Sequence, residues 1–354
     1  MTTRQVKLGG ISIGGGAPVV VQTMTNTDTA DKEKTLTQIY LVASRGAEVV
    51  RLAVPDHKAA LALKEITPLS PVPLVADIHF DYRLALSAIE GGVAGLRINP
   101  GNIGEAKKIR LVAESAGKAN LAIRIGVNAG SLDKEIAAKY GHGHEAMVRS
   151  ALKEIALIEE TGFTNLKVSL KASDVAMTIA AVRLFAKESD LPQHLGITEA
   201  GDLKSGAVRS AVGLGILLFE GLGDTIRVSL TGPPEEEVDC AWEILRALDL
   251  RSHGPRFISC PTCGRCKIDL PTLLAEVKNR LSDLKTPLTI AVMGCVVNGP
   301  GEAKMADVGL AGGKDRGRLF VKGRAVGSYP FEELAERLEL LARKMADQDN
   351  HNQF

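Results

Sequence analysis

The chain has 354 residues, of which 45% are hydrophobic and 24% are charged, with a formal net charge of +1. This composition is typical of a globular protein with room for about two domains. The near-zero net charge excludes an overall field that would attract nucleic acid or a membrane surface. No apolar run approaches the roughly 20 residues that span a bilayer, and residues 1–7 lack the apolar core of a signal peptide. We therefore expect a cytoplasmic protein.

Short β-rich runs alternate with longer helical patterns through the first 250 residues. We expect eight strands, at residues 19–23, 49–54, 74–78, 95–99, 122–127, 166–170, 195–198 and 225–230. We expect helices at residues 32–45, 56–65, 82–90, 103–116, 144–160, 172–187, 204–219 and 235–248. Such alternation predicts right-handed βα crossovers and a parallel sheet.

Eight βα units in about 250 residues match the size of a (β/α)8 barrel. The rival α/β architecture is a doubly wound open sheet, whose dinucleotide-binding members carry a GxGxxG turn after the first strand. Here the glycines at positions 14–16 precede the first expected strand and are interpreted as a turn. We therefore expect residues 1–250 to form a TIM-type barrel.

Charged and polar side chains occupy the end of nearly every expected strand. They are Gln22, Arg51, Asp77, His79, Arg97, Asn99, Arg124, Asn128, Lys167, Ser169, Lys171, Thr198, Glu199, Arg227 and Ser229. Buried parallel strands are otherwise continuous apolar runs. In barrels of this type, active-site groups project from the C-terminal ends of the strands, so these side chains are candidates for a binding site.

Basic side chains outnumber acidic ones at least two to one at these strand ends. One interpretation is a network of ion pairs that closes the barrel, with Asp77 and Glu199 as the acidic partners. Unpaired buried cations are costly, however, so a bound anion explains the excess better. The planar guanidinium of arginine suits phosphate oxygens. Four arginines and a lysine exceed the needs of one monophosphate, which favours a diphosphate or bisphosphate ligand.

Residues 250–256 are interpreted as a linker, because Gly254 and Pro255 interrupt regular structure. Residues 257–354 are expected to form a small α/β domain. In it we expect a helix at 271–284, a strand at 288–293, a loop at 294–302, a strand at 308–311, a hairpin at 319–326 and a helix at 331–345.

Four of the five cysteines lie in this second domain. Cys260, Cys263 and Cys266 follow one another at two-residue spacing, and Cys295 comes later. Thiolates are soft ligands that suit iron–sulfur clusters, zinc or Cu(I), and a cytosolic setting disfavours disulfides. The CxxCxxC run favours a cluster over zinc, although zinc ribbons also use CxxC.

The chain resembles the 4-hydroxy-3-methylbut-2-enyl diphosphate synthase family over nearly its whole length. The resemblance is carried by CPTCGR at 260–265 and MGCVVNGPGE at 293–302. In the expected barrel it is carried by VVQTMTNTDT at 20–29, ADIHF at 76–80, RINPGN at 97–102, RIGVN at 124–128 and GITEAG at 196–201. The chain is similar to the short two-domain bacterial form of this enzyme, which belongs to the methylerythritol phosphate route to isoprenoids.

The resemblance implies a [4Fe–4S] cluster held by Cys260, Cys263, Cys295 and Glu302. It implies that Cys266 lies outside the ligand set, which differs from what the CxxCxxC spacing favours. A carboxylate is a harder ligand for iron than a thiolate, so one iron could exchange Glu302 for a substrate oxygen.

The implied reaction is the reductive dehydration and ring opening of 2-C-methyl-D-erythritol 2,4-cyclodiphosphate to (E)-4-hydroxy-3-methylbut-2-enyl diphosphate, by two one-electron transfers. By the resemblance, the residues that hold the diphosphate would be Arg51, Arg97, Arg124, Lys171, Arg227 and Ser229. Asp77 and Asn128 would orient the ring. Glu199 would transfer a proton, and Asn298 would lie beside the cluster.

Family members receive electrons from flavodoxin or ferredoxin, so the resemblance implies such a partner.

The substrate must meet both the barrel rim and the cluster iron, yet the last barrel helix returns the chain to the N-terminal face of the barrel. A linker of roughly 8 residues spans at most about 28 Å. We therefore expect a head-to-tail homodimer in which each cluster domain caps the partner's barrel.

Two other functions are compatible with the residues alone. One is a phosphate-binding barrel lyase or isomerase with a structural zinc domain. The other is a non-enzymatic iron–sulfur electron carrier or redox sensor, which would not need a cationic rim on a separate barrel.

His142 and His144 lie in a glycine-rich loop and are interpreted as structural, and Cys240 is interpreted as a buried small hydrophobe.

Overall fold

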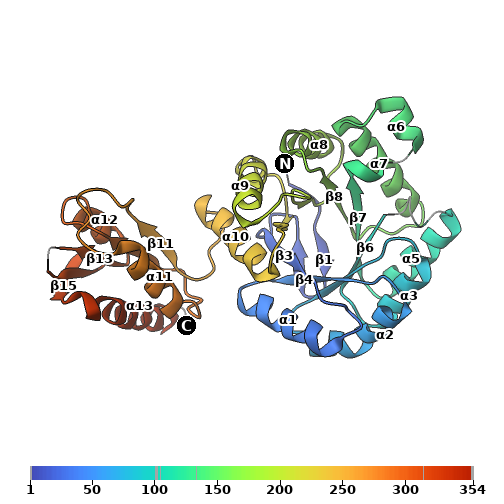
Figure 1. Ribbon diagram of the computed structural model, residues 1–354. Coiled ribbons are helices and arrows are strands. Elements are labelled where there is room, and N and C mark those ends of the chain that lie inside the picture. Colours follow the sequence, from blue (N-terminus) through green and yellow to red (C-terminus); the bar gives the residue numbers. More distant parts are fainter. Residues whose placement is uncertain (1, 100–102, 104, 133, 314, 352–354) are drawn as a thin grey trace. The chain divides into compact units, whose positions relative to one another are not determined.

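The computed structural model describes residues 2–99, 103, 105–132, 134–313 and 315–351. The chain divides into two compact units, Met1–Arg251 and Ser252–Phe354. Each unit has a sheet and a hydrophobic core of its own. Figure 1 shows both, and each is described here by itself.

The first unit is built around eight parallel strands. They are β3 (Val20–Met24), β4 (Val49–Ala53), β5 (Leu74–Asp77), β6 (Gly95–Ile98), β7 (Ala122–Asn128), β8 (Leu166–Lys171), β9 (His194–Leu195) and β10 (Thr225–Ile226). Their order is β8-β7-β6-β5-β4-β3-β10-β9. A parallel bridge from Val168 of β8 to Gln193, just before β9, joins the two ends of this order. The predicted (β/α)8 barrel is confirmed.

Helices surround this barrel (Figure 1). They are α1 (Lys32–Ser44), α2 (His57–Ile66), α3 (Tyr82–Glu90), α5 (Ala106–Lys118), α6 (Lys134–Tyr140), α7 (His144–Glu159), α8 (Val175–Glu188), α9 (Leu203–Phe219) and α10 (Pro234–Ala247). Several begin where an aspartate carboxylate accepts a hydrogen bond from a backbone N–H of the first turn, which stabilises a helix start. These aspartates are Asp31, Asp56, Asp81, Asp174 and Asp202.

A hairpin closes the N-terminal end of the barrel. Its strands are β1 (Val6–Leu8) and β2 (Ile11–Ile13), which pair antiparallel. Its side chains pack against Val20, Val75 and Ala122, the first inward-facing residues of three barrel strands. The sequence reasoning missed this hairpin, because three-residue strands give too short an alternation to recognise.

Two barrel strands are shorter than predicted. The expected strands at 195–198 and 225–230 are reduced to β9 and β10, of two residues each. Close packing surrounds the residue after β9, because a Cβ at Gly196 would lie 2.7 Å from the carbonyl oxygen of Arg227 and would also collide with Nζ of Lys171.

The second unit has a five-stranded sheet in the order β11-β12-β13-β14-β15. The strands are β11 (Arg256–Ser259), β12 (Thr289–Met293), β13 (Val308–Gly312), β14 (Gly317–Val321) and β15 (Arg324–Tyr329). The first three are parallel, and the last two pair antiparallel. The helices are α11 (Leu270–Arg280), α12 (Gly299–Met305) and α13 (Leu334–His351).

Two expectations for this unit are corrected. The strand β11 pairs with β12 over residues that the sequence reasoning left without regular structure. The expected loop at 294–302 ends earlier, because α12 begins at Gly299. Pro300 sits in the first turn, where a helix needs no N–H from it. Gly309 of β13 lets α12 approach closely, since a Cβ there would lie 2.6 Å from Cα of Ala303.

No helix in the described part of the chain is both long enough and apolar enough to cross a bilayer.

Candidate active site

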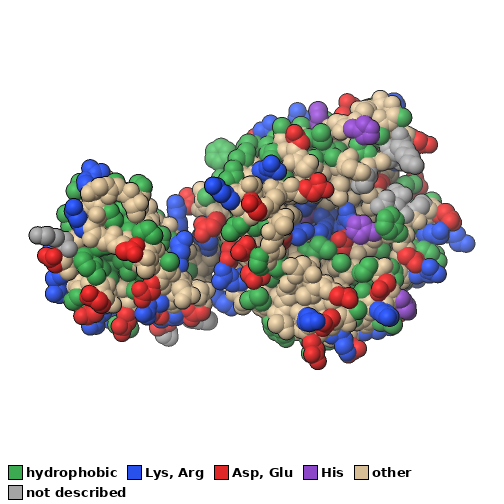
Figure 2. Space-filling view, viewed as in Figure 1, with side chains coloured by type: hydrophobic (Ala, Val, Ile, Leu, Met, Phe, Trp, Pro, Cys, Tyr) green, Lys and Arg blue, Asp and Glu red, His purple; other side chains and the backbone are tan. Residues whose placement is uncertain are grey.

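The interior of the barrel changes from apolar to charged along the strands. Successive side chains of a strand alternate between its two faces, so the residues two positions after Val20, Val75 and Ala122 also face inward. The inward residues above the apolar layer are Gln22, Met24, Arg51, Asp77, Arg97, Arg124, Lys167, Ser169, Lys171 and Arg227. Figure 2 shows blue Lys and Arg side chains recessed at the centre of the barrel unit.

Asp77 is the counterion of two arginines. Its Oδ1 lies 3.1 Å from Nη1 of Arg97, and its Oδ2 lies 3.5 Å from Nε of Arg51. Burial by itself would raise the pKa of Asp77, but Arg51, His79 and Arg97 outweigh it and hold that pKa well below its ordinary value. Asp77 is therefore a buried carboxylate that stays ionised.

A second buried carboxylate comes from helix α10. Glu237 accepts hydrogen bonds from Nη2 of Arg227 at 2.9 Å and from Nε at 3.1 Å. It also accepts from Oγ1 of Thr23 at 2.8 Å and from the backbone N–H of Leu230 at 3.1 Å. The sequence reasoning missed Glu237, because three consecutive glutamates at a helix start are equally well explained by the helix dipole.

Met24 was missed as well. Its sulfur lies 3.0 Å from Nη2 of Arg51 and 3.8 Å from Nη1 of Arg227. A thioether is a weak acceptor, so Met24 contacts two guanidinium groups without neutralising either. Its inward position two residues after Gln22 on β3 was a usable signal.

The remaining cations have little to pair with. Nη1 of Arg124 donates to Oγ of Ser169 at 3.0 Å, but Nε and Nη2 of Arg124 and Nζ of Lys167 have no hydrogen-bond partner among the described residues. The interior of the described barrel thus holds six basic side chains, Arg51, Arg97, Arg124, Lys167, Lys171 and Arg227. Two carboxylates, Asp77 and Glu237, lie within ion-pair distance of members of this set.

These charges repel one another strongly. Burial lowers the pKa of Arg51 to about 10, with Asp77 opposing the shift and Arg227 and Arg97 adding to it. Burial, followed by the neighbouring arginines, also holds the pKa values of Arg124 and Lys171 well below their ordinary values. Arginine stays protonated in proteins, so the barrel interior carries an excess of positive charge that a bound anion would relieve.

Two glycines make room for these cations. A Cβ at Gly126 would lie 2.7 Å from Nε of Arg97, and a Cβ at Gly196 would collide with Nζ of Lys171. Both glycines lie in the RIGVN and GITEAG segments singled out from the sequence. Any larger residue at either position would displace a charged side chain of the site.

The other predicted barrel residues lie at the C-terminal ends of strands. Asn128 is half-buried and pairs in register with Lys171, and Ser229 is half-buried three residues after β10. Glu199 is exposed and has a backbone φ of 52°. Few residues other than glycine adopt a positive φ, and such strain is often retained at functional sites.

In the second unit, three of the four cysteines there have contacts around Gly294. The backbone N–H of Gly294 donates to Sγ of Cys260 at 3.3 Å, and a Cβ at Gly294 would collide with Sγ of Cys266. Cys295 is the next residue along the chain. Cys263 is exposed, in the short segment between Cys260 and α11.

The surroundings of Cys295 and Cys263 favour thiolates. Backbone N–H groups of Asn298, Val297 and Gly299, at the start of α12, lower the pKa of Cys295. The backbone and side chain of Arg265 lower the pKa of Cys263. Deprotonated cysteine is the form that binds metals. Glu302, in the first turn of α12, is exposed beside this segment.

This donor set fits an iron–sulfur cluster. A cluster distributes its thiolates over several irons, and backbone N–H groups commonly contact its sulfurs. Cys266 differs from the other cysteines, because its thiol donates to the carbonyl of Ile268 at 3.3 Å.

The residues that the sequence reasoning set aside lie away from these sites. His142 is exposed, and His144 is the first residue of α7. Cys240 is half-buried on α10, where burial raises the pKa of its thiol to about 11.

Family models match both units of the chain. The model described as "GcpE TIM-barrel domain" matches residues 3–242, and the model described as "GcpE protein C-terminal domain" matches residues 256–344.

Curated relatives match nearly end to end. A Lawsonia intracellularis protein named "4-hydroxy-3-methylbut-2-en-1-yl diphosphate synthase (flavodoxin)" is 59% identical over 327 residues, which cover 92% of this chain and 91% of the relative. A Geobacter sulfurreducens protein of the same name is 56% identical over 337 residues, which cover 95% of this chain and 96% of the relative.

Among solved structures, dihydropteroate synthase from Stenotrophomonas maltophilia matches with a TM-score of 0.52 and 14% identity, over 70% of this chain and 98% of that one. A truncated 3-deoxy-D-arabino-heptulosonate 7-phosphate synthase from Thermotoga maritima matches with a TM-score of 0.50 and 15% identity, over 70% of this chain and 91% of that one. At this level of identity the likeness shows the fold alone.

Proposed function

The chain belongs to the GcpE family, and we propose that its two units divide one reaction, the barrel binding an anionic substrate and the second unit supplying electrons. The chain is an oxidoreductase of the 4-hydroxy-3-methylbut-2-enyl diphosphate synthase type. It converts 2-C-methyl-D-erythritol 2,4-cyclodiphosphate to (E)-4-hydroxy-3-methylbut-2-enyl diphosphate by reductive ring opening with loss of water.

The observation that carries the proposal for the barrel is its excess of buried cations. The residues proposed to hold the diphosphate are Arg51, Arg97, Arg124, Lys171, Arg227 and Ser229. An anion at this place would accept the hydrogen bonds that Arg124 leaves unmade, and charge-assisted bonds of this kind are the strong ones. Asp77 and Glu237 keep Arg51, Arg97 and Arg227 in position for it.

Three other residues act on the organic part of the substrate in this proposal. Asn128, at the end of β7, and Asp77 orient the ring. Glu199 is exposed at the C-terminal end of the barrel and transfers a proton as water is lost. Its strained backbone is the observation that supports a specific role.

The second unit would hold a [4Fe–4S] cluster through Cys260, Cys263, Cys295 and Glu302. The backbone N–H groups that surround Cys260 and Cys295 support this assignment. When bound, the cluster would supply the two electrons one at a time. Asn298 precedes α12 and would lie beside it. The relatives' names specify flavodoxin, so we propose flavodoxin as the electron donor.

The course of the chain supports a head-to-tail homodimer. The cationic side chains lie toward the C-terminal ends of the barrel strands, whereas α10 runs back toward the N-terminal end. Eight residues separate the end of α10 at Ala247 from the start of β11 at Arg256, and they extend to at most about 28 Å. In the proposed dimer, the cluster unit of one chain therefore serves the barrel of its partner.

Anaerobic turnover tests the proposal. The protein is purified without oxygen, its iron, sulfide and zinc are measured, and it is mixed with the cyclodiphosphate and a strong one-electron reductant. The expected result is a brown protein that forms the linear diphosphate product, identified by mass spectrometry. A colourless zinc protein, or a cluster-loaded protein that leaves the cyclodiphosphate unchanged, would overturn it.

A further inference from the structure

The sheet of the second unit is covered differently on its two faces. On one face, α11 and α13 pack against strand residues such as Val292 and Leu319. On the other face, α12 packs against strand residues such as Met293 and Phe320. Figure 1 shows α12 and α13 on different sides of this sheet. Because α12 has only seven residues, it covers its face only in part.

The surface on and beside α11 and α13 carries paired charges. Its ion pairs have nitrogen–oxygen distances between 2.8 and 3.2 Å, and they are Arg280–Glu276, Arg280–Glu339, Arg337–Glu333, Arg343–Asp283 and Arg343–Glu339. Exposed pairs of this kind add little stability. They do balance positive with negative charge on this side of the unit.

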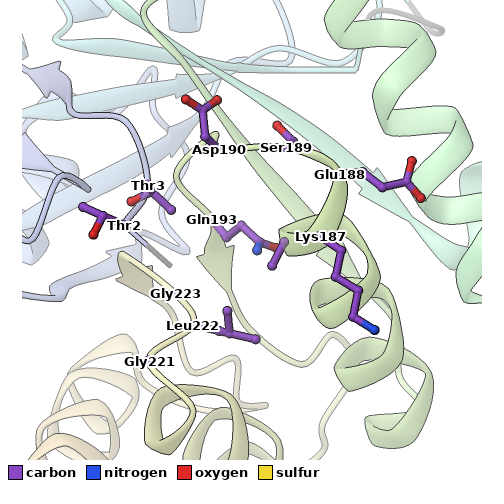
Figure 3. A pocket seen from close by; sticks show the side chains of 11 residues that line it. Thr2, Thr3, Lys187, Glu188, Ser189, Asp190, Gln193, Gly221, Leu222 and Gly223 are labelled. Atoms are coloured by element: carbon purple, nitrogen blue, oxygen red, sulfur yellow. The ribbon is translucent and has the colours of Figure 1, made fainter.

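A cavity in the barrel unit has paired carboxylates as well. It has a volume of about 480 Å³ and lies at the N-terminal end of the barrel, where Figure 3 shows its lining residues. Of these, Asp190 lies 2.6 Å from Nη2 of Arg4, and Glu188 lies 2.6 Å from Nη1 of Arg149. Arginines of the same chain therefore satisfy both carboxylates, which do not call for a bound cation.

Unpaired cations lie on the α12 side of the second unit's sheet. Lys304, Arg318 and Lys322 are exposed and form no ion pair with any residue that the structure describes. Lys304 lies in the last turn of α12. Arg318 of β14 pairs in register with Ala311 of β13 and therefore shares its face, which is the face that α12 covers.

The turn between β14 and β15 brings Lys322 to the end of α12. A Cβ at Gly323 would lie 3.3 Å from the carbonyl oxygen of Lys304. Lys322 has a φ of 44° and Gly323 a φ of 80°, and positive φ at both positions is typical of a type I′ hairpin turn. Such turns favour Asn, Asp or Gly, so local turn chemistry does not explain a lysine at position 322.

An exposed apolar side chain accompanies these cations. Met305 follows Lys304 at the end of α12 and is 84% exposed. One exposed apolar residue is ordinary by itself, but transient electron-transfer complexes use small interfaces, in which apolar contacts lie inside a polar rim. Lys304, Met305, Arg318 and Lys322 together are called the α12 patch.

The α12 patch lies close to the cysteine segment. Helix α12 begins at Gly299, four residues after Cys295. A helix of seven residues is about 10 Å long, so Met305 lies about that far along the helix from the segment that contains Cys295. The patch is therefore near the proposed cluster without including any of its proposed ligands.

We propose that the α12 patch is the docking surface for an acidic electron-transfer protein. Its unpaired cations attract a partner of opposite charge and raise the rate of productive encounter. The barrel of a second copy is a poorer occupant, because the site in that barrel is itself rich in basic side chains. In each encounter the donor protein is oxidised by one electron and the second unit is reduced by one electron, with no bond made or broken.

This inference rests on the proposed function, in which flavodoxin is the electron donor. It deepens that proposal, because it assigns the contact to one side of the second unit and to electrostatic attraction. The paired surface of α11 and α13 serves as an internal comparison, since a donor that docked there would meet balanced charge.

Turnover with two electron sources tests this inference. The holoenzyme is assayed anaerobically with the cyclodiphosphate and either a reduced acidic flavodoxin or reduced methyl viologen, a small cation that no cationic surface attracts. Varying the flavodoxin concentration gives a KM for flavodoxin. Lys322→Glu should raise this KM roughly threefold, and Lys304→Glu combined with Lys322→Glu roughly tenfold. Turnover with methyl viologen should equal that of the wild type.

Lys344→Glu is the matched control. It makes the same change of charge at an exposed lysine of α13, and it should leave the KM for flavodoxin close to the wild-type value. Added salt should raise the wild-type KM and narrow the difference from the Lys322→Glu variant, because salt screens exposed charges. Lys322→Asn suits the positive φ of this position and covers the case in which Lys322→Glu does not fold.

Three results would count against these proposals. An equal KM for flavodoxin in the Lys322 variants and Lys344→Glu overturns the inference. Equal loss of turnover with flavodoxin and with methyl viologen also overturns it, because the patch would then serve the cluster or a partner's barrel. A wild-type holoenzyme that is inactive even with methyl viologen contradicts the proposed function instead.

Discussion

The two units differ in how deeply they bury the side chains that are proposed to function. In the barrel, Arg124 and Lys167 are each 1% exposed and are held by strand register inside a large core. In the second unit, Cys263 is exposed and Cys260 and Cys295 are half-buried, in short segments between strands and helices. The side chains of the barrel site are therefore in place before a ligand binds, and their unpaired charge lowers the stability of the ligand-free protein. In the proposed assignment the cysteine segments become a defined site only when the cluster is bound, because metal binding and folding are commonly coupled.

The largest effect is expected in the second unit, from substitution of a cysteine that is proposed to bind the cluster. Cys263→Ser should lose the iron and essentially all activity, because a serine oxygen is a poor replacement for a thiolate ligand. Iron and sulfide content, the visible spectrum and anaerobic turnover measure the effect. Cys266→Ser is the matched control and should retain most of the iron and activity. Equal loss in both variants would refute the ligand set of three cysteines and one glutamate.

The same measurements on Glu302→Gln refine this prediction. The variant should fold and keep iron, since three thiolates remain, but turnover should fall sharply because the amide is a weaker ligand. Full activity in Glu302→Gln would remove Glu302 from the ligand set.

The next largest effect is expected in the barrel, where loss of a cationic side chain should weaken substrate binding. Arg124→Met should weaken cyclodiphosphate binding by about 1.5–3 kcal/mol for each charged hydrogen bond that is lost, which is roughly 10- to 150-fold. Calorimetry measures the affinity, and the iron content should match that of the wild type. Wild-type affinity in Arg124→Met would contradict a phosphate site in the barrel.

Much of the barrel could be predicted, because hydrophobic runs at regular intervals and eight βα repeats are strong local signals. The positions of Arg51, Arg97, Arg124 and Lys171 at strand ends pointed to an anion for the same reason. Because successive side chains of a strand point to opposite faces, every second residue of each strand faces the barrel interior. The contact of Glu237 with Arg227 could not be predicted, because it joins α10 to the end of the preceding strand β10 across the intervening loop, and no local pattern fixes that pairing.

The second unit was less predictable for a physical reason. Its helix α12 begins with Gly299, Pro300 and Gly301, residues that usually signal a loop. Packing of Ala303 against Gly309 overrides that local preference. Strand β11 has two half-buried apolar residues between two exposed polar ones, without alternation, and is too short to recognise without its neighbour β12.

A third prediction concerns the ion pair that pre-forms the barrel site. Glu237→Gln should lower the free energy of unfolding by about 3 kcal/mol, because it leaves the guanidinium of Arg227 buried without its counterion. Urea denaturation of the ligand-free protein measures the change. Glu236→Gln, at the neighbouring position of α10, is the control and should be close to wild type. Equal stability of both variants would show that the Arg227–Glu237 pair is not what holds Arg227.

The smallest expected effect concerns Lys167 and pH. Its pKa of about 7 in the folded protein lies below the ordinary value of about 10.4 in the unfolded chain. Between these values the unfolded state binds more protons, so the contribution of Lys167 to stability rises with pH. Lys167→Met should therefore stabilise the ligand-free protein more at pH 6 than at pH 8.5, by about 2 kcal/mol. A pH-independent difference in urea denaturation would contradict a neutral Lys167.

Mixing two inactive variants tests most directly the central claim that the barrel and the cysteine unit are the two halves of one active site, drawn from different chains. Arg124→Ala has a defective barrel with an intact cysteine unit, and Cys263→Ser has the converse. After subunit exchange, differently tagged heterodimers are isolated and assayed anaerobically with the cyclodiphosphate. The account predicts restored activity, up to about one intact site per heterodimer. Isolated heterodimers without activity would contradict it.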